Sequence, residues 1–143
     1  MNTAAVLGPG AVGGSLAVRL ANAGVQVVCV AHPEAVGLIA LAGLVVESPE
    51  GTLTARVEVV EQLAKPVDLL LVTVKAPALD DAVARVDPSA VEHGVVVPLL
   101  NGLEHMDVLK ARFDGRVAAG TISHFRPTVQ GACRSSKRRR HPL

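Results

Sequence analysis

The sequence contains few aromatic residues and no long apolar run. Two of its 143 residues are Phe, and none is Trp or Tyr. Proteins that hold single-stranded nucleic acids stack the bases on aromatic side chains, so this composition argues against such a partner. The longest apolar runs, LLLVTV and GVVVPLL, are far shorter than the roughly 20 residues of a membrane-spanning helix. We therefore expect a protein that does not enter a membrane.

The sequence also lacks a cysteine framework and a secretion signal. Its two cysteines, Cys29 in an apolar run and Cys133 in a polar segment, form neither a C-x-x-C pair nor a disulfide pattern. The apolar stretch near the N-terminus follows no basic residue and is interrupted by glycines, unlike a signal peptide. These features predict a protein of the reducing cytoplasm.

Apolar runs alternate with helical segments over a length that amounts to about one domain. The runs are apolar on both faces, which is typical of parallel strands covered by helices on both sides. We therefore predict an α/β fold with a doubly wound parallel sheet of the Rossmann type. The predicted strands are Thr3–Leu7, Val25–Val30, Asp68–Val74, Gly94–Leu100 and Val117–Ser123, and the predicted helices are Ala11–Ala23, Pro33–Ala42, Leu79–Val86 and Leu103–Phe113.

One segment breaks this alternation. The stretch LVVESPEGTLTARVEVV, residues 44–60, has two β-branched runs around a Ser-Pro-Glu-Gly turn. This pattern predicts a β-hairpin, which we expect to lie at an edge of the sheet.

A glycine motif, VLGPGAVGG, follows the first predicted strand and begins the first predicted helix. In this position Gly8, Gly10 and Gly13 match the G-x-G-x-x-G fingerprint of dinucleotide-binding domains. Gly8 permits the tight turn, Gly10 lets the backbone approach a pyrophosphate, and Gly13 lets the helix pack on the strand. The helix N-terminus offers N–H groups to the anion. The alternative is a turn that needs its glycines only for packing.

The end of the second predicted strand bears on which dinucleotide is bound. Domains that prefer NAD place Asp or Glu there to hold the ribose 2′-hydroxyl, whereas this sequence has Ala31 and His32. No carboxylate would repel a 2′-phosphate, and a partly charged imidazole would attract one. The motif therefore favours NADP, the alternative for His32 being a solvated loop residue.

Two polar residues follow later strands. Lys75 comes directly after the run LLLVTV, and Asn101 stands between the run VVVPLL and a helix. Ligands of open parallel sheets bind beyond the carboxyl ends of the strands, which makes both residues candidates for catalytic and for cofactor-binding residues. The alternatives are a solvated charge for Lys75 and a turn or N-cap residue for Asn101.

The motifs LGPGAVGG, DLLLVTVKAPALDDAV, LLNGLEHMDVL and GTISHFRP resemble, in this order, those of the 2-dehydropantoate 2-reductase (ketopantoate reductase) family. The resemblance runs from residue 3 to about residue 130. It implies reduction of a 2-keto acid to its 2-hydroxy acid with NADPH, on the route to pantothenate. By the same resemblance the loop Gly8, Pro9, Gly10, Ala11, Val12 and Gly13 holds the pyrophosphate, Lys75 lies near the cofactor, Asn101 lies between nicotinamide and substrate, and Arg126 lines the cofactor.

The sequence departs from the family pattern at two points. His32 stands where the family has an arginine for the 2′-phosphate. The family's second, helical domain, which carries the lysine that acts as general acid, is expected to be absent, because this chain ends before it. A cofactor-binding module without catalysis is therefore an alternative, and we expect a homodimer or a partner chain to cover the face of the missing domain. No metal is expected.

The last ten residues, RSSKRRRHPL, hold five basic residues and no acidic one, which leaves 9 basic and 13 acidic residues before them. We predict a Rossmann domain over residues 1–131 and a basic, disordered tail over residues 132–143. The tail gives a second alternative, a nucleic-acid-associated protein, which the acidic body and the lack of aromatic residues disfavour.

Overall fold

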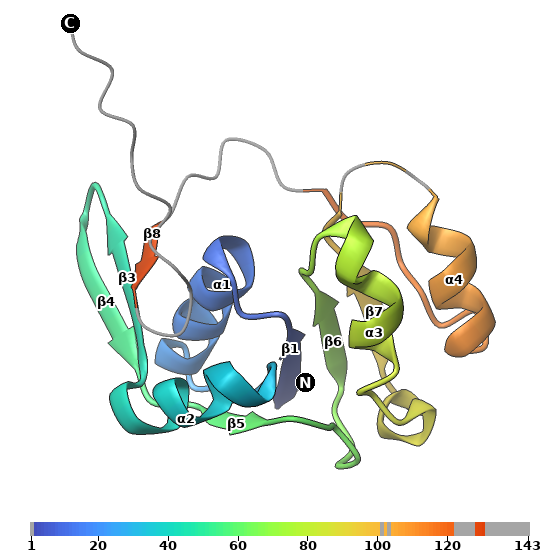
Figure 1. Ribbon diagram of the computed structural model, residues 1–143, viewed down its shortest axis with the longest axis horizontal. Coiled ribbons are helices and arrows are strands. Elements are labelled where there is room, and N and C mark those ends of the chain that lie inside the picture. Colours follow the sequence, from blue (N-terminus) through green and yellow to red (C-terminus); the bar gives the residue numbers. More distant parts are fainter. Residues whose placement is uncertain (1, 101, 103, 122–127, 131–143) are drawn as a thin grey trace, which may run out of the picture.

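The computed structural model describes residues 2–100, 102, 104–121 and 128–130. Five strands form a parallel sheet in the order β5-β2-β1-β6-β7, and the helices alternate with them along the chain (Figure 1). The doubly wound α/β prediction is thus confirmed. No described helix is long and apolar enough to cross a membrane. The bounds are β1 Thr3–Leu7, α1 Ala11–Asn22, β2 Gln26–Val30, α2 Pro33–Ala42, β5 Glu58–Val60, β6 Leu69–Val72, 3₁₀ helix η1 Ala76–Ala78, α3 Leu79–Val83, 3₁₀ helix η2 Pro88–Val91, β7 Val95–Pro98 and α4 His105–Arg112.

Successive strand residues point to opposite faces of the sheet, and both faces are buried. In β1, Val6 packs in one core cluster with Ala17 and Val18 of α1. Its neighbour Leu7 packs in the other cluster, with residues of α3 and α4 such as Leu109. The central strands β1, β2 and β6 therefore read as nearly unbroken apolar runs, because most of their residues are buried on one face or the other.

A second, antiparallel sheet lies beside the first. The predicted hairpin is confirmed as β3 (Leu44–Ser48) and β4 (Gly51–Ala55), and β8 (Thr128–Gln130) pairs with the free side of β3. The expectation that the hairpin lies at an edge of the main sheet is wrong, because α1 stands between the hairpin and β1 (Figure 1). Leu44 and Val46 are buried in the same core cluster as α1, which explains this position.

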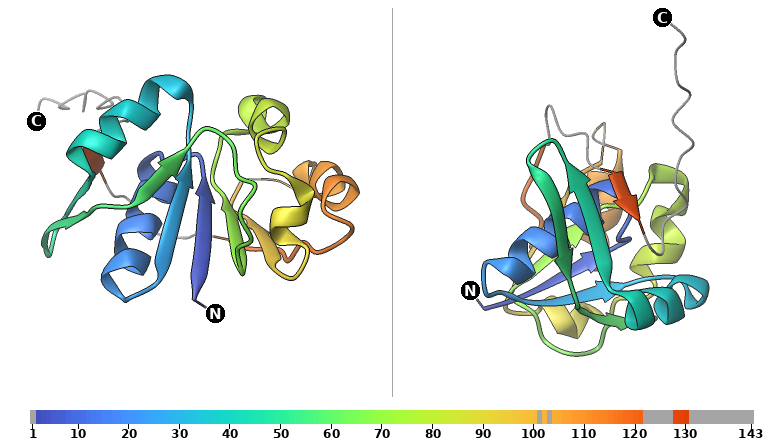
Figure 2. Two further views of the ribbon diagram at one scale, coloured as in Figure 1. Left: turned by 90° about the horizontal axis from the view of Figure 1, so that it is seen from below. Right: turned by 90° about the vertical axis from the view of Figure 1, so that its left-hand side faces the viewer.

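Other boundaries differ from the sequence prediction. The run after the hairpin breaks at residues 56–57, and Glu58–Val60 turns back to pair in parallel with β2 as the edge strand of the main sheet (Figure 2). Of the predicted strand Val117–Ser123, the described part makes a single bridge, between Val117 and Val96. The predicted domain boundary at residue 131 and the basic tail lie outside the described residues.

Asp68, just before β6, ties the start of β1 to the sheet. Its Oδ2 accepts hydrogen bonds from the backbone N–H of Asn2 and Thr3, at 3.0 and 3.1 Å, and from the Thr3 hydroxyl at 2.9 Å. These bonds, with the backbone N–H of Asn2 first, lower the pKa of the Asp68 carboxyl from its ordinary value. The ionised form of Asp68 therefore stabilises the fold.

We predict that Asp68→Asn lowers the urea midpoint of unfolding at neutral pH. Because the folded-state pKa of Asp68 is lowered, its contribution is present above the unfolded pKa near 4 and is lost as the pH falls through the folded value. The difference between the wild-type and Asn midpoints should therefore shrink steadily in titrations below about pH 4. A difference that is the same at pH 7 and in strong acid would contradict this account.

Candidate functional site

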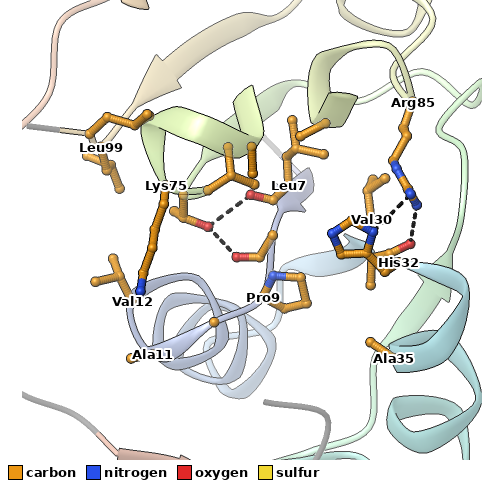
Figure 3. Close-up of a pocket in the computed structure, with 18 of the residues that line it drawn as sticks. Leu7, Pro9, Ala11, Val12, Val30, His32, Ala35, Lys75, Arg85 and Leu99 are labelled. Carbon is orange, nitrogen blue, oxygen red and sulfur yellow. Dashed lines mark hydrogen bonds between the residues drawn. The ribbon is translucent and has the colours of Figure 1, made fainter. Parts of the chain in front are cut away.

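A cavity of about 740 Å³ opens at the carboxyl ends of β1, β2, β6 and β7. It lies where the strand order reverses, since β2 follows β1 on one side and β6 lies on the other. Ligands of doubly wound sheets bind at this reversal. The described residues that line it are Leu7, Gly8, Pro9, Gly10, Ala11, Val12, Val30, Ala31, His32, Ala35, Thr73, Val74, Lys75, Ala76, Ala78, Ala82, Arg85, Leu99 and Leu100 (Figure 3).

The glycine loop forms the floor of this cavity. Gly8 has φ +83°, in the left-handed region that favours glycine, and a Cβ there would collide with the Val74 side chain. Gly10 is the N-cap residue of α1, in an extended conformation. A Cβ on Gly13 would lie 2.6 Å from the carbonyl oxygen of Gly8 and 2.9 Å from Cγ1 of Val6. The glycines thus let α1 begin directly against the end of β1.

Thr73, which the sequence analysis did not single out, fastens the loop to the end of β6. Its hydroxyl lies 3.0 Å from the carbonyl oxygen of Leu7 and 2.7 Å from that of Gly8, and donates its one proton between them. Its backbone N–H also donates to Leu7, at 3.0 Å. Its position one residue before Val74 and two before Lys75, directly after a buried strand, was the available signal.

The electrostatics of the cavity favour an anion. Among the described residues no side chain caps the N-terminus of α1, and its first turn holds no acidic residue. The helix dipole and the N–H groups of that turn therefore face the cavity without a protein anion. The described lining residues include Lys75, Arg85 and His32, and none of them is acidic.

Lys75 is exposed and precedes η1. Its side chain extends across the cavity toward Val12 in the first turn of α1, on the opposite side of the glycine loop from Arg85 (Figure 3). Asn101 and Arg126 lie outside the described residues, so their roles stay predictions. The two residues before Asn101, Leu99 and Leu100, do line the cavity.

His32 lies at the end of β2 as predicted and is joined there by Arg85, which the sequence analysis missed. Arg85 Nη1 donates to the carbonyl oxygen of Ala31 at 3.0 Å, and Nη2 lies 3.0 Å from Nδ1 of His32 (Figure 3). Arg85 follows α3, 53 residues beyond His32 in sequence. No local pattern links the two residues, because the turn after α3 brings them together.

Comparisons with known proteins agree with this geometry. The family model described as ketopantoate reductase PanE/ApbA matches residues 4–132. The chain belongs to the ketopantoate reductase family. It is 39% identical over 123 residues to the 2-dehydropantoate 2-reductase of Caulobacter vibrioides, over 83% of this chain and 39% of that protein. The resemblance seen in the sequence is thereby confirmed.

Solved structures of a ketopantoate reductase and of a D-mandelate dehydrogenase share the fold. A PanE/ApbA family ketopantoate reductase from Ralstonia eutropha JMP134 superposes with a TM-score of 0.74 at 30% identity, over 82% of this chain and 40% of that one. A D-mandelate dehydrogenase in complex with NADH superposes with a TM-score of 0.67 at 27% identity, over 85% of this chain and 38% of that one. The chain thus spans about two fifths of the length of the relatives it matches.

A pair of helical glycines, Gly13 in α1 and Gly37 in α2, allows a test of the close approach of α1 to β1. We predict that Gly13→Ala destabilises the protein by about 1–3 kcal/mol, because the new methyl group meets backbone and strand atoms that cannot move freely. Gly37→Ala, in α2, is the matched control. Its Cβ meets nothing within 4 Å, so the better helix propensity of Ala should stabilise the protein by about 0.5–1 kcal/mol. Urea unfolding measures both, and equal effects would refute the packing role of Gly13.

Proposed function

We propose that this chain binds NADPH in the cavity and serves a cytoplasmic oxidoreductase that reduces 2-dehydropantoate, or a related 2-keto acid, to the 2-hydroxy acid. The observation that carries the proposal is the glycine loop between β1 and α1, at the point where the strand order reverses. Membership of the ketopantoate reductase family supports the reaction class. The D-mandelate dehydrogenase solved with NADH supports a nicotinamide cofactor.

The residues present fit such a dinucleotide. The first turn of α1, behind Gly10, offers N–H groups to a pyrophosphate, and a side chain on Gly8 or Gly13 would disrupt the loop that presents them. Small apolar lining residues, among them Ala35 and Ala78, leave room for flat rings. We assign Gly8, Pro9, Gly10, Ala11, Val12 and Gly13 to pyrophosphate binding. The reduced nicotinamide supplies the hydride in such reactions.

Lys75 is the main charged residue that this chain contributes where nicotinamide and substrate would meet. Its ammonium group is the one lysine charge among the described lining residues, and its side chain turns toward the start of α1. There it attracts the negatively charged groups of cofactor and keto acid. We assign Asn101 to the space between nicotinamide and substrate, and Arg126 to the cofactor wall, from the resemblance of their motifs.

A cofactor-binding module without its own catalysis is the second candidate. The specific observation that favours it is the match to only 39% of the length of the curated relative. In that case a second copy of the chain or another protein covers the open side of the cavity. Binding of NADPH is common to both candidates, whereas turnover separates them.

We expect Gly10→Val to abolish NADPH binding, because its side chain occupies the space in which the pyrophosphate approaches the backbone. Isothermal titration calorimetry on the purified chain measures this. Gly37→Val, on the exposed part of α2, is the control and should bind like the wild type. A folded Gly10→Val variant with unchanged affinity would show that the loop is structural and that the nucleotide assignment is wrong.

We further expect the purified 143-residue chain to bind NADPH without oxidising it measurably when 2-dehydropantoate is added. Reduction of the keto group leaves an alkoxide that needs a proton, and a positioned general acid contributes about 10² to 10⁴ in rate. Lys75, the one lysine among the described lining residues, is assigned to the cofactor. The assay follows NADPH absorbance. Saturable turnover that Lys75→Ala removes would mean that this domain is a complete enzyme.

A further inference from the structure

The guanidinium of Arg85 lies beside the end of β2, the place at which Rossmann domains distinguish the two nicotinamide dinucleotides. In Rossmann domains the residue at the end of the second strand faces the adenosine ribose. Here that residue is His32, and the guanidinium of Arg85 lies beside it, with Nη2 3.0 Å from its Nδ1 (Figure 3). The same guanidinium holds the carbonyl oxygen of Ala31 at 3.0 Å.

The backbone that carries Arg85 is fixed on several sides. Its N–H donates to Ala82 at 3.0 Å, and its carbonyl oxygen accepts from Leu63 at 2.8 Å. Arg112 of α4 binds the carbonyl oxygens on either side, those of Val83 and Val86, both at 2.8 Å. Arg85 is therefore a half-buried side chain held in place before any ligand arrives, which reduces the entropy lost on binding.

The contacts of Arg85 with Ala31 and His32 leave most N–H donors of these two side chains, Arg85 and His32, available to a ligand. A guanidinium has five N–H groups and no acceptor, so Arg85 must be the donor to His32. With Nδ1 as acceptor, the His32 ring carries its proton on Nε2, which is a further donor. Three N–H groups of Arg85 remain beyond the two bonds to Ala31 and His32. Among the described residues no carboxylate forms an ion pair with Arg85, so its charge is not neutralised there.

Resting on the proposed dinucleotide site, we infer that Arg85 recognises the 2′-phosphate of a 2′-phosphorylated adenosine and that His32 positions it. Arginine suits this role because its planar N–H groups bind phosphate oxygens in pairs. The cavity supplies no described carboxylate to bind a ribose 2′-hydroxyl instead. The positive charge that favours NADPH thus comes from the turn after α3, 53 residues away from the strand end that it serves.

A competing role for Arg85 is a stacking contact with the adenine ring, which is common to NADPH and NADH. The two roles differ in their prediction for the pair of ligands. A phosphate contact affects NADPH and leaves NADH unchanged, whereas a stacking contact affects both equally. The ratio of the two dissociation constants is therefore the measurement that separates them.

The test is calorimetric titration of the full chain and its Arg85→Gln, Arg85→Lys and His32→Ala variants with NADPH, NADH, adenosine 2′,5′-bisphosphate and 5′-AMP. Arg85→Gln should weaken NADPH and the bisphosphate about tenfold to a hundredfold, and NADH and 5′-AMP less than about threefold. Arg85→Lys should retain part of the preference, and His32→Ala should lose part of it. Arg19→Ala, an exposed arginine of α1, is the control for charge alone and should leave the ratio unchanged. Thermal unfolding verifies that each variant is folded.

The outcomes separate the inference from the proposed function. A wild-type chain that binds neither dinucleotide overturns both. A wild-type chain that binds NADH and NADPH equally well, or an Arg85→Gln variant with the wild-type ratio, overturns the inference and leaves dinucleotide binding intact. Equal losses for NADPH and NADH also overturn it, in favour of adenine stacking. If Arg85→Gln unfolds, the Arg85→Lys variant decides by the same ratio.

Discussion

The close approach of α1 to β1 is the constraint on which the rest of this site depends. The helix begins three residues after Gly8, and a Cβ on Gly13 would lie 2.6 Å from the Gly8 carbonyl oxygen. No residue other than glycine leaves the helix that close to the strand. Thr73 holds the same carbonyl oxygen from the side of β6, at 2.7 Å. The loop is therefore fixed between two neighbouring strands, and its geometry exists before any ligand binds.

This constraint also accounts for the placement of the second sheet. One side of α1 packs on the main sheet. Apolar residues of the hairpin pack against α1 in the same core cluster. Leu44 and Val46 are buried in the cluster that includes Val18 of α1. The hairpin thus covers the helix that presents the glycine loop. Packing on both sides of α1 stabilises the orientation of the N-terminus that faces the cavity.

The parts of the fold that the sequence predicts are those with local signals. The first strand, Thr3–Leu7, and the helix Pro33–Ala42 have the predicted bounds, because a glycine follows the one and proline and glycine flank the other. The glycine loop was likewise legible from its spacing. Thr73, Arg85 and β8 were missed because their partners lie far away in sequence, 65 residues for Thr73 and Gly8. Such contacts follow from topology, which composition and periodicity do not encode.

The contrast between local signals and distant contacts also applies to the end of β2, where the sequence indicated His32 but not Arg85. His32 was visible there as an isolated polar residue, and its imidazole was the only basic group that the local sequence offered. In the folded chain the guanidinium of Arg85 lies beside it, and its bond to Nδ1 of His32 leaves the imidazole in the tautomer with its proton on Nε2. Figure 3 shows Lys75 and Arg85 on opposite sides of the glycine loop, so the two cationic side chains flank the helix N-terminus. A ligand with one central and one terminal anionic group matches that arrangement better than a ligand with a single charge.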